Sequence, residues 1–440
     1  MAKQTSSYGI EISHADKIFY KTIALLNDAV TLCIDVFENE WDKISVLNGV
    51  FRNGFAEKLI HGTKNNLPKY PEFDTRFRKM PSYMRRAAIS CALGALSSYH
   101  SNYDNWLAGG CIGSEPTLQR KRNIMPTFYR DNSYLDGNGD TVNLKLFVNG
   151  DWNWVSFTLK HTDMQYIRRH CDMSHMSCPT LEKVHNKWFL RFSFTKEHHL
   201  RNKKYNEQTI LAVDLGINTD AVCSVMRSDG TVLARKFINF ASDKDLIYHT
   251  LNKIKKVSQT SSPHNTTKLW RYATLHNEEL GRKIAGAITD YAVSQKCDVI
   301  VFEHLDTHVK KKGSKSKKQR LHMWRKNTIQ KITEHKAHKN GIRISRICAW
   351  NTSRLAYDGS GVVERGRDAG FSTNGLCRFQ NGKIYNCDLS ASYNIGARYF
   401  IGAIQKSISA KKWSLIQAKV PECEKRTQCT YSTLLSINAA

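Results

Sequence analysis

Two apolar runs in this chain each end in a carboxylate, and this pattern limits the folds that the chain can adopt. Residues 211–213 are apolar and lead into Asp214, and residues 299–302 are apolar and lead into Glu303. Short apolar runs of this kind are typical of buried strands. A carboxylate at the end of such a strand is costly unless something binds it there. The pattern therefore predicts a buried sheet with a ligand, most simply a cation, at its strand ends.

A third acidic residue, Asp388, opens a helix-like stretch over residues 388–396. Each acid alone is a weak signal, because an Asp-Leu-Gly sequence is usually a turn and an Asp near a helix start is usually a cap. Three acids from three elements, in this chain order, indicate one shared cation site.

From about residue 208 the sequence predicts an α/β pattern. Three strands joined by tight turns are followed by a broken helical stretch, a buried strand, a helix and a last strand. The expected ranges are 211–215, 220–226, 232–238, 243–295, 298–303, 322–340 and 342–347. A meander carrying an Asp, then a strand ending in Glu, then a late helix carrying an Asp, is the order of the α/β RNase H-like fold.

The first 200 residues follow two other patterns. Residues 15–107 have helical periodicity, with one helix expected to start at Pro81. From about 117 to 200 strands alternate, and Asn149-Gly150 between two strand-like runs is a strong hairpin signal. A second hairpin is expected around residues 185–187. We expect a small antiparallel β-barrel whose aromatic side chains lie mainly in its core.

The charge of the chain points to a polyanionic partner. Lys and Arg number 66 against 39 Asp and Glu, a formal net charge of +27. This excess is too large for an ordinary metabolic enzyme and indicates nucleic acid. A solvated basic face is the alternative for each cation. The candidate contacts are Arg76, Arg78, Lys79, Arg85, Arg86, Arg120, Lys121, Arg122, Arg365 and Arg367, with the Lys-rich loop 310–318 as a further one.

The cysteines and the apolar runs indicate a compartment. The 12 Cys form no CxxC pair, and no signal peptide or run of membrane-spanning length is visible. We therefore expect reduced thiols, a cytoplasmic, nucleoid-associated prokaryotic protein, and no membrane partner.

Four segments together resemble a known family. They are 213–218, 300–305, 351–353 and 388–396, and they resemble the RuvC-type domain of the TnpB family of transposon-encoded RNA-guided nucleases and of the compact type V CRISPR effectors. The resemblance is strong over about 205–400 and weaker over 1–205. It implies a guide RNA, a double-stranded DNA target cut beside a short flanking motif, and one active site that cuts both strands.

The resemblance also implies a division of the chain. Residues 1–14 and 115–205 would form a wedge-type barrel around a helical recognition lobe at 15–114. Residues 206–349 and 386–440 would form the nuclease, with a degenerate zinc-ribbon-like insert at 350–385. Whether the chain is a monomer or a homodimer stays open, as does a transposon or a CRISPR origin of the guide.

Chemistry supports the same three acids without any family. Two Mg²⁺ ions about 3.5–4 Å apart can activate a water and stabilise the leaving oxygen at phosphorus, and Mg²⁺ prefers hard oxygen ligands. We expect Asp214, Glu303 and Asp388 to be the catalytic metal ligands, with Asp214 bridging both ions and each of the others favouring one.

The insert departs from the family's zinc ribbon. No Cys pair follows Thr352-Ser353, and only Cys377 and Cys387 lie near the second expected pair. A structural zinc site needs four ligands in paired spacing. We expect no zinc here, and expect glycine turns at 359, 361, 375 and 382 and aromatic packing by Tyr357, Phe371, Phe379 and Tyr385 to hold the loop.

Two other functions stay open. The same fold serves transposases and junction resolvases that act on DNA without a guide, although a large basic N-terminal region exceeds what such an enzyme needs. A guided DNA-binding regulator that does not cut is a third hypothesis; such proteins lose at least one carboxylate, and here all three are present.

Overall fold

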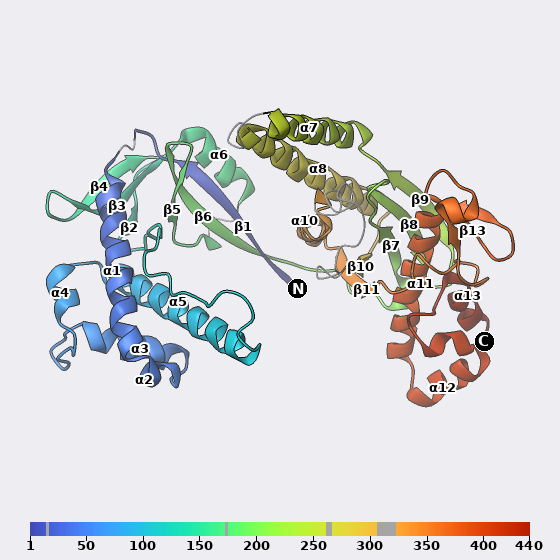
Figure 1. The fold of residues 1–440 in the computed structure, drawn as a ribbon, viewed down its shortest axis with the longest axis horizontal. Coiled ribbons are helices and arrows are strands. Elements are labelled where there is room, and N and C mark those ends of the chain that lie inside the picture. The colour runs from blue at the N-terminus through green and yellow to red at the C-terminus, as the bar shows by residue number, and fades with distance from the viewer. Residues whose placement is uncertain (15–16, 172–174, 261–265, 306–322) are drawn as a thin grey trace. The chain divides into compact units, whose positions relative to one another are not determined.

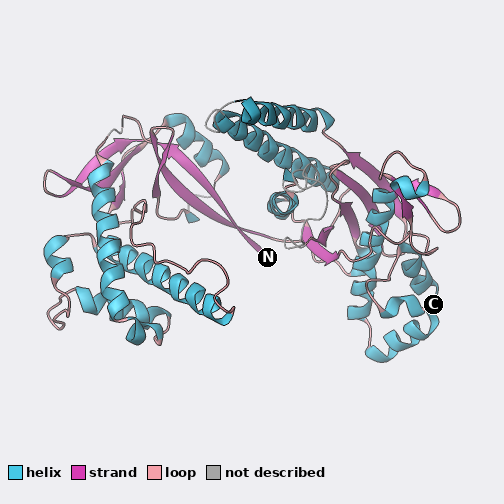
Figure 2. Ribbon diagram, in the orientation of Figure 1, coloured by secondary structure: helices cyan, strands magenta, loops and turns pink. Residues whose placement is uncertain are grey.

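The computed structural model describes residues 1–14, 17–171, 175–260, 266–305 and 323–440. The chain divides into two compact units, one of residues 5–196 and one of residues 1–4 with 197–440 (Figure 1). Figure 2 shows that each unit combines helices with strands. The Lys-rich loop 310–318 lies outside the described residues.

Along the chain, the long helices of the N-terminal unit come after its first strand and before its other strands. The helices are α1 (Phe19–Asn39), α2 (Trp41–Ser45), α3 (Gly49–Ile60), α4 (Glu72–Arg76), α5 (Ser82–Ala108) and α6 (His161–His170). The strands are β1 (Ala2–Glu11), β2 (Tyr134–Asp136), β3 (Thr141–Val148), β4 (Asp151–Thr158), β5 (Thr180–Val184) and β6 (Lys187–His198). They form two three-stranded sheets, β1-β6-β5 and β2-β3-β4. The isolated bridge Ile12–Leu159 joins the chain just after β1 to the chain just after β4, and the bridge Thr127–Thr180 joins the segment before β2 to β5.

Both predicted hairpins are present. Asn149 and Gly150 join β3 to β4 with φ of 55° and 85°, and His185 and Asn186 join β5 to β6 with φ of 47° and 65°. Two successive residues with positive φ give the backbone twist that matches the twist of the flanking strands. Turn chemistry therefore sets the register of both pairs.

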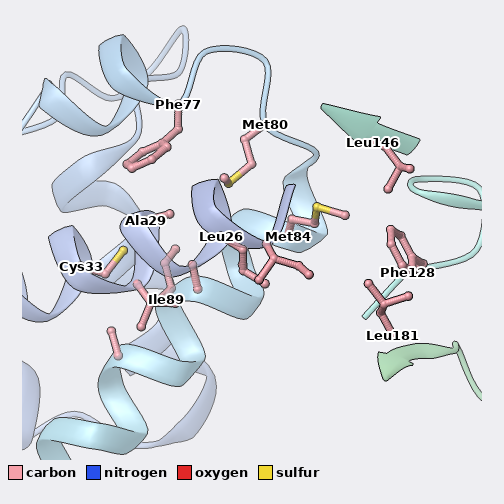
Figure 3. Close-up of a cluster of buried hydrophobic side chains, with 14 of the residues drawn as sticks. Leu26, Ala29, Cys33, Phe77, Met80, Met84, Ile89, Phe128, Leu146 and Leu181 are labelled. Atoms are coloured by element: carbon pink, nitrogen blue, oxygen red, sulfur yellow. The ribbon is translucent and has the colours of Figure 1, made fainter. Parts of the chain in front are cut away.

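The core of this unit joins its helices to its sheets. Leu26, Ala29 and Cys33 of α1 face Met84 and Ile89 of α5, and Figure 3 shows these side chains gathered between the two helices. Buried side chains of the strands continue the same cluster. The strand aromatics lie mainly in this core, as expected, whereas Trp154 is 42 % exposed and the half-buried Phe189 is not part of the cluster.

The C-terminal unit contains the α/β pattern that the sequence predicts. Its strands are β7 (Thr209–Asp214), β8 (Ala221–Arg227), β9 (Val232–Ile238), β10 (Val299–His304), β11 (Arg343–Cys348), β12 (Glu364–Arg365), β13 (Leu376–Arg378) and β14 (Ile384–Asn386). Its α-helices are α7 (Ala241–Thr260), α8 (Thr267–Ser294), α10 (Lys326–Lys339), α11 (Cys387–Ser407), α12 (Ala410–Lys419) and α13 (Tyr431–Ala439). Short 3₁₀ turns are η2 (Tyr205–Glu207), η4 (Gly366–Ala369) and η5 (Pro421–Glu424).

The main sheet of this unit has the strand order β11-β10-β7-β8-β9. The first three strands in the chain, β7 to β9, pair antiparallel, and β10 and β11 are parallel to β7. This is the RNase H-like arrangement: a meander on one side of the first strand and two parallel strands, each reached through helices, on the other.

The two faces of this sheet bury different helices. Alternate residues of β7, such as Ile210 and Ala212, pack with α11 and α13, and the residues between them pack with α8 and α10. Gly396 of α11 lies so close to the sheet that a Cβ there would be 3.2 Å from Ala212 Cβ and 2.4 Å from Met226 Sδ. The glycine therefore brings α11 directly onto β7 and β8 (Figure 1).

The insert is a small three-stranded sheet, β12-β13-β14, with its own core. The core is formed by Ala356, Val363, Cys377, Phe379 and Cys387, with Tyr357 and Tyr385 packed against it. Phe371 does not join it and lies under the Arg378 guanidinium instead. Gly359, Gly361 and Gly382 have positive φ as turns require, and Gly375 does not. The absence of zinc stays a prediction.

Candidate active site

Strand pairing places Asp214 and Glu303 side by side. Val213 of β7 is in register with Phe302 of β10, and each acid is the next residue of its strand. The two strands are parallel, so both acids lie at the same, carboxyl-terminal edge of the sheet. Side chains alternate along strands, so Asp214 faces the side to which Ile210 and Ala212 point, which is the side of α11.

Helix α11 brings Asp388 to the same face. Asn386 is its N-cap, with Oδ1 accepting a hydrogen bond of 2.9 Å from Leu389 N, so Asp388 lies in the first turn. The loop after β7 passes beside it, because a Cβ on Gly216 would be 3.9 Å from Asp388 Oδ2. The same Cβ would be 2.5 Å from Thr219 O, which explains the glycine in the Asp-Leu-Gly sequence.

The three carboxylates repel one another electrostatically. Burial, and then the charges of Glu303 and Asp388, raise the pKa of Asp214 well above its ordinary value. Asp214 is only 8 % exposed. Burial also raises the pKa of Glu303 and of Asp388. Buried carboxylates that lie together without full compensation are unusual in a purely structural role and are typical of functional sites.

A hydrogen-bonded loop orients Glu303. Thr352 Oγ1 donates a hydrogen bond to Glu303 Oε1, and this bond acts to lower the pKa that burial raises. The loop is held by the buried Asn394 of α11, whose Nδ2 donates to Thr352 O and Leu355 O, both at 2.9 Å. Asn394 Oδ1 in turn accepts from Tyr431 N at 2.9 Å. Helix α11 therefore fixes both Asp388 and the residue that orients Glu303.

Two arginines supply positive charge to the site. Arg365 of β12 lowers the pKa of both Asp214 and Asp388, and its Nη2 atom is buried without a hydrogen-bond partner among the described residues. Arg398 of α11 acts in the same direction on Glu303. Its guanidinium donates to the carbonyl oxygens of Cys429, Cys348, Trp350 and Thr427 at 2.6–3.1 Å. Sequence reasoning gave Arg398 and Thr352 no role.

Asp214, Glu303 and Asp388 lie near one another, but their carboxylates do not surround a single position for a metal ion. Among the residues that the structure describes, no group of three His, Cys, Asp or Glu side chains is placed to hold a metal ion. The donor set nevertheless suits Mg²⁺, which takes oxygen ligands and keeps several waters. The raised pKa of Asp214 is the observation that favours a cation here, since a bound cation would offset the repulsion that contributes to it.

Apart from Arg367, the other basic candidates lie in the N-terminal unit, and they differ in whether a carboxylate already pairs with them. Arg85 and Arg86 pair with Glu57, Arg120 pairs with Asp35 and Glu38, Lys79 pairs with Asp151, and Arg76 lies 3.9 Å from Glu72. Arg78 and Lys121 are exposed and Arg122 is half-buried. The Arg367 side chain lies outside the described part of the structure. Ion pairs with carboxylates already hold five of the ten candidates.

Comparisons with known proteins give one partial family match and several structural neighbours. A sequence model of the Aq_aa04 family matches residues 4–148, and no curated protein matches the chain. No helix among the described residues is both long enough and apolar enough to cross a membrane.

Several solved structures that resemble this chain are nucleic-acid complexes. Cas12f1 in complex with sgRNA and target DNA has a TM-score of 0.36 and 13% identity, over 89% of this chain and 98% of that chain. C2c1 of Alicyclobacillus acidoterrestris with single-guide RNA has a TM-score of 0.42 and 10% identity, over 87% and 69%. CasPhi-2 (Cas12j) bound to crRNA has a TM-score of 0.40 and 9% identity, over 90% and 98%. All three are distant in sequence, and the case for an activity comes from the carboxylates.

Proposed function

We propose that this chain is an endonuclease that hydrolyses phosphodiester bonds of double-stranded DNA beside a short flanking motif, and that a guide RNA directs it. One observation carries the nuclease part. Three acids from β7, β10 and α11 lie on one face of an RNase H-like sheet, and the pKa of the most buried one is raised by burial and by its two neighbours. A catalytic role explains this arrangement better than a structural one.

The catalytic residues in this proposal are Asp214, Glu303 and Asp388, which would hold two Mg²⁺ ions. The ions would activate a water and stabilise the leaving oxygen. Asp214, central and buried, is suited to bridge them. Thr352 fixes the orientation of the Glu303 carboxylate through its hydrogen bond. Arg365 offsets part of the negative charge at Asp214 and Asp388.

Charge and organisation support the guide. A formal net charge of +27 suits a chain that holds both a guide and a target. The N-terminal unit adds a helical region and two sheets to the nuclease unit, which is more than strand cutting requires. The resemblance of segments 213–218, 300–305 and 388–396 to TnpB-type nucleases favours the same conclusion. Base pairing by the guide would then supply sequence specificity, and the protein would read only the flanking motif.

Substitution of Asp214 tests the nuclease. Asp214→Ala should abolish Mg²⁺-dependent cutting of a guide-matched duplex while leaving RNA binding near wild type, because one ligand is lost and the fold is kept. Asp229→Ala is a matched control, since this acid lies in the turn at the opposite end of β8. Full cutting by Asp214→Ala would refute the assignment.

The guide needs a separate test, because a transposase or resolvase of this fold would also lose cutting in Asp214→Ala. Protein purified from its native locus should carry a discrete RNA, and RNase treatment should remove both that RNA and sequence-directed cutting. Cutting that survives RNase treatment would favour a nuclease without a guide. A discrete RNA with DNA binding but no cutting would favour a cleavage-silent regulator.

A further inference from the structure

A cationic pocket lies along the free edge of the nuclease sheet. It has a volume of about 410 Å³ and is bounded by the edge strand β11 and by α11. Its lining includes five basic side chains and no Asp or Glu. The basic residues are Arg343, Arg346, Arg398, Lys406 and Arg426. Like charges gathered in one concave site repel one another, and an anion entering it would offset that repulsion.

The cations differ in what they already bind. Arg398 already donates to four carbonyl oxygens, and Arg346 bonds to Gln330 and Glu334. The Arg343 side chain hydrogen-bonds to Tyr399, but its Nε and Nη2 atoms are buried without a hydrogen-bond partner among the described residues. Arg343 as a whole is half-buried, and its two open donors present a planar fork that matches a phosphate group.

The wall of the pocket is shaped for close approach. Gly402 lies in the interior of α11, where glycine weakens a helix. No heavy atom lies within 4 Å of the place where its Cβ would be, so packing against the protein does not require a glycine here. A side chain at Gly402 would project into the pocket that this residue lines, so the glycine leaves that space open for a ligand.

We propose that this pocket binds a phosphodiester group of a nucleic-acid strand, through Arg343 and Lys406 with Gly402 exposing the helix backbone. The proposal rests on the proposed function in that it takes nucleic acid as the polyanion. It adds an anchoring site on the edge strand of the sheet, separate from the carboxylates. An RNA strand and a DNA strand offer the same phosphate chemistry, and the test distinguishes them.

The test measures binding of fluorescein-labelled 20-nucleotide RNA and DNA single strands of the same sequence to the full chain, by anisotropy. All proteins carry Asp214→Ala so that the DNA probe stays intact. The variants are Arg343→Gln with Lys406→Gln, and separately Gly402→Glu, which places a negative side chain in the pocket. Lys331→Gln, which removes one charge from the exposed face of α10, is the control.

We expect each pocket variant to bind at least one of the two strands about tenfold more weakly than the control, and the affected strand identifies the ligand. The double variant should also lower the dependence of log K on log salt by about 0.7–0.9 for each phosphate that it no longer neutralises. Affinity and salt dependence equal to the control for both strands would overturn the proposal. Circular dichroism identifies a misfolded Arg343 variant, in which case Gly402→Glu decides.

This outcome is independent of the proposed function. A chain that cuts no guided duplex can still bind both labelled strands through the pocket. A chain that cuts normally can still show no effect of the pocket variants.

Discussion

Replacing Asp214 with Asn should stabilise the protein in the absence of divalent cations. The carboxylate is buried, and its pKa is raised first by burial and then by the charges of Glu303 and Asp388. Asparagine keeps the shape and removes the charge. If Asp214 is needed for cutting, then the protein keeps a charge that lowers the stability of its fold.

The size of this gain in stability follows from the spacing between neighbouring strands of the sheet. Neighbouring strands lie about 5 Å apart, and two unit charges at that separation repel by about 3 kcal/mol at an effective dielectric constant of about 20. Arg365 offsets part of this repulsion. We therefore expect a gain of about 2 kcal/mol for the variant. For a unit of this size the melting temperature should rise by about 4–8 °C.

The pH dependence has a definite sign. A carboxyl whose pKa is higher in the folded than in the unfolded state costs nothing below its unfolded pKa. The cost begins as pH rises above the unfolded pKa, grows with pH, and is complete above the folded pKa. The melting temperature of the wild type should therefore fall relative to that of Asp214→Asn as pH rises above about 4. Added Mg²⁺ should reverse the order by stabilising the wild type, by about 2.7 kcal/mol at about one hundred times its Kd.

Thermal unfolding in EDTA and in Mg²⁺ measures both effects, and Asp220→Asn is the matched control. Asp220 is also buried, but its carboxylate accepts a hydrogen bond of 2.7 Å from Phe240 N and pairs with Lys244 at 3.2 Å. Its replacement should destabilise the protein under all conditions. If Asp214→Asn behaves like Asp220→Asn in EDTA, then the charge of Asp214 is compensated in the fold and the reasoning is wrong.

Three further substitutions test the framework of the site. Thr352→Val removes the hydrogen bond that lowers the pKa of Glu303. The acidic limb of the pH–rate profile for cutting should therefore move to higher pH. An unmoved limb would contradict the orienting role of Thr352. Gly396→Val should destabilise by about 1–3 kcal/mol in urea unfolding, because its side chain would collide with Met226. An unchanged midpoint would show that α11 can shift. Arg398→Met leaves four carbonyl oxygens without their donor. It should lower the free energy of unfolding in urea by at least about 2 kcal/mol. A smaller loss would mean that water replaces the guanidinium.

The strands that carry the acids could be predicted because their signal is local. β7 and β10 are buried on both faces, so they appear as unbroken apolar runs. The hairpin at Asn149-Gly150 is set by two residues alone. Helix α6 escaped prediction because it is short and polar: within His161–His170 only Ile167 is buried, so the segment carries few apolar residues from which a helix could be recognised.

The interactions that tune the site could not be predicted from the sequence. Arg365 was a candidate for nucleic-acid contact, and its effect on Asp214 arises only when the insert folds back beside β7. The bond from Thr352 to Glu303 likewise joins residues 49 positions apart. Arg85 and Arg120 looked available in the sequence, but acids from other helices pair with them. Composition gives the sign of the net charge, whereas tertiary structure decides which acid pairs with each basic side chain.

Helix α11 fixes the distance between Asp388 and the cationic pocket. Its first turn carries Asp388, one of the proposed catalytic residues, and it lines the cationic pocket at Gly402, 14 residues later. At about 1.5 Å per residue the two points are about 21 Å apart along the axis, which equals about six steps of about 3.4 Å along one strand of a duplex. A strand anchored at the pocket would meet the carboxylates at a set number of nucleotides, so lengthening or shortening this helix by one turn should shift where the cut falls.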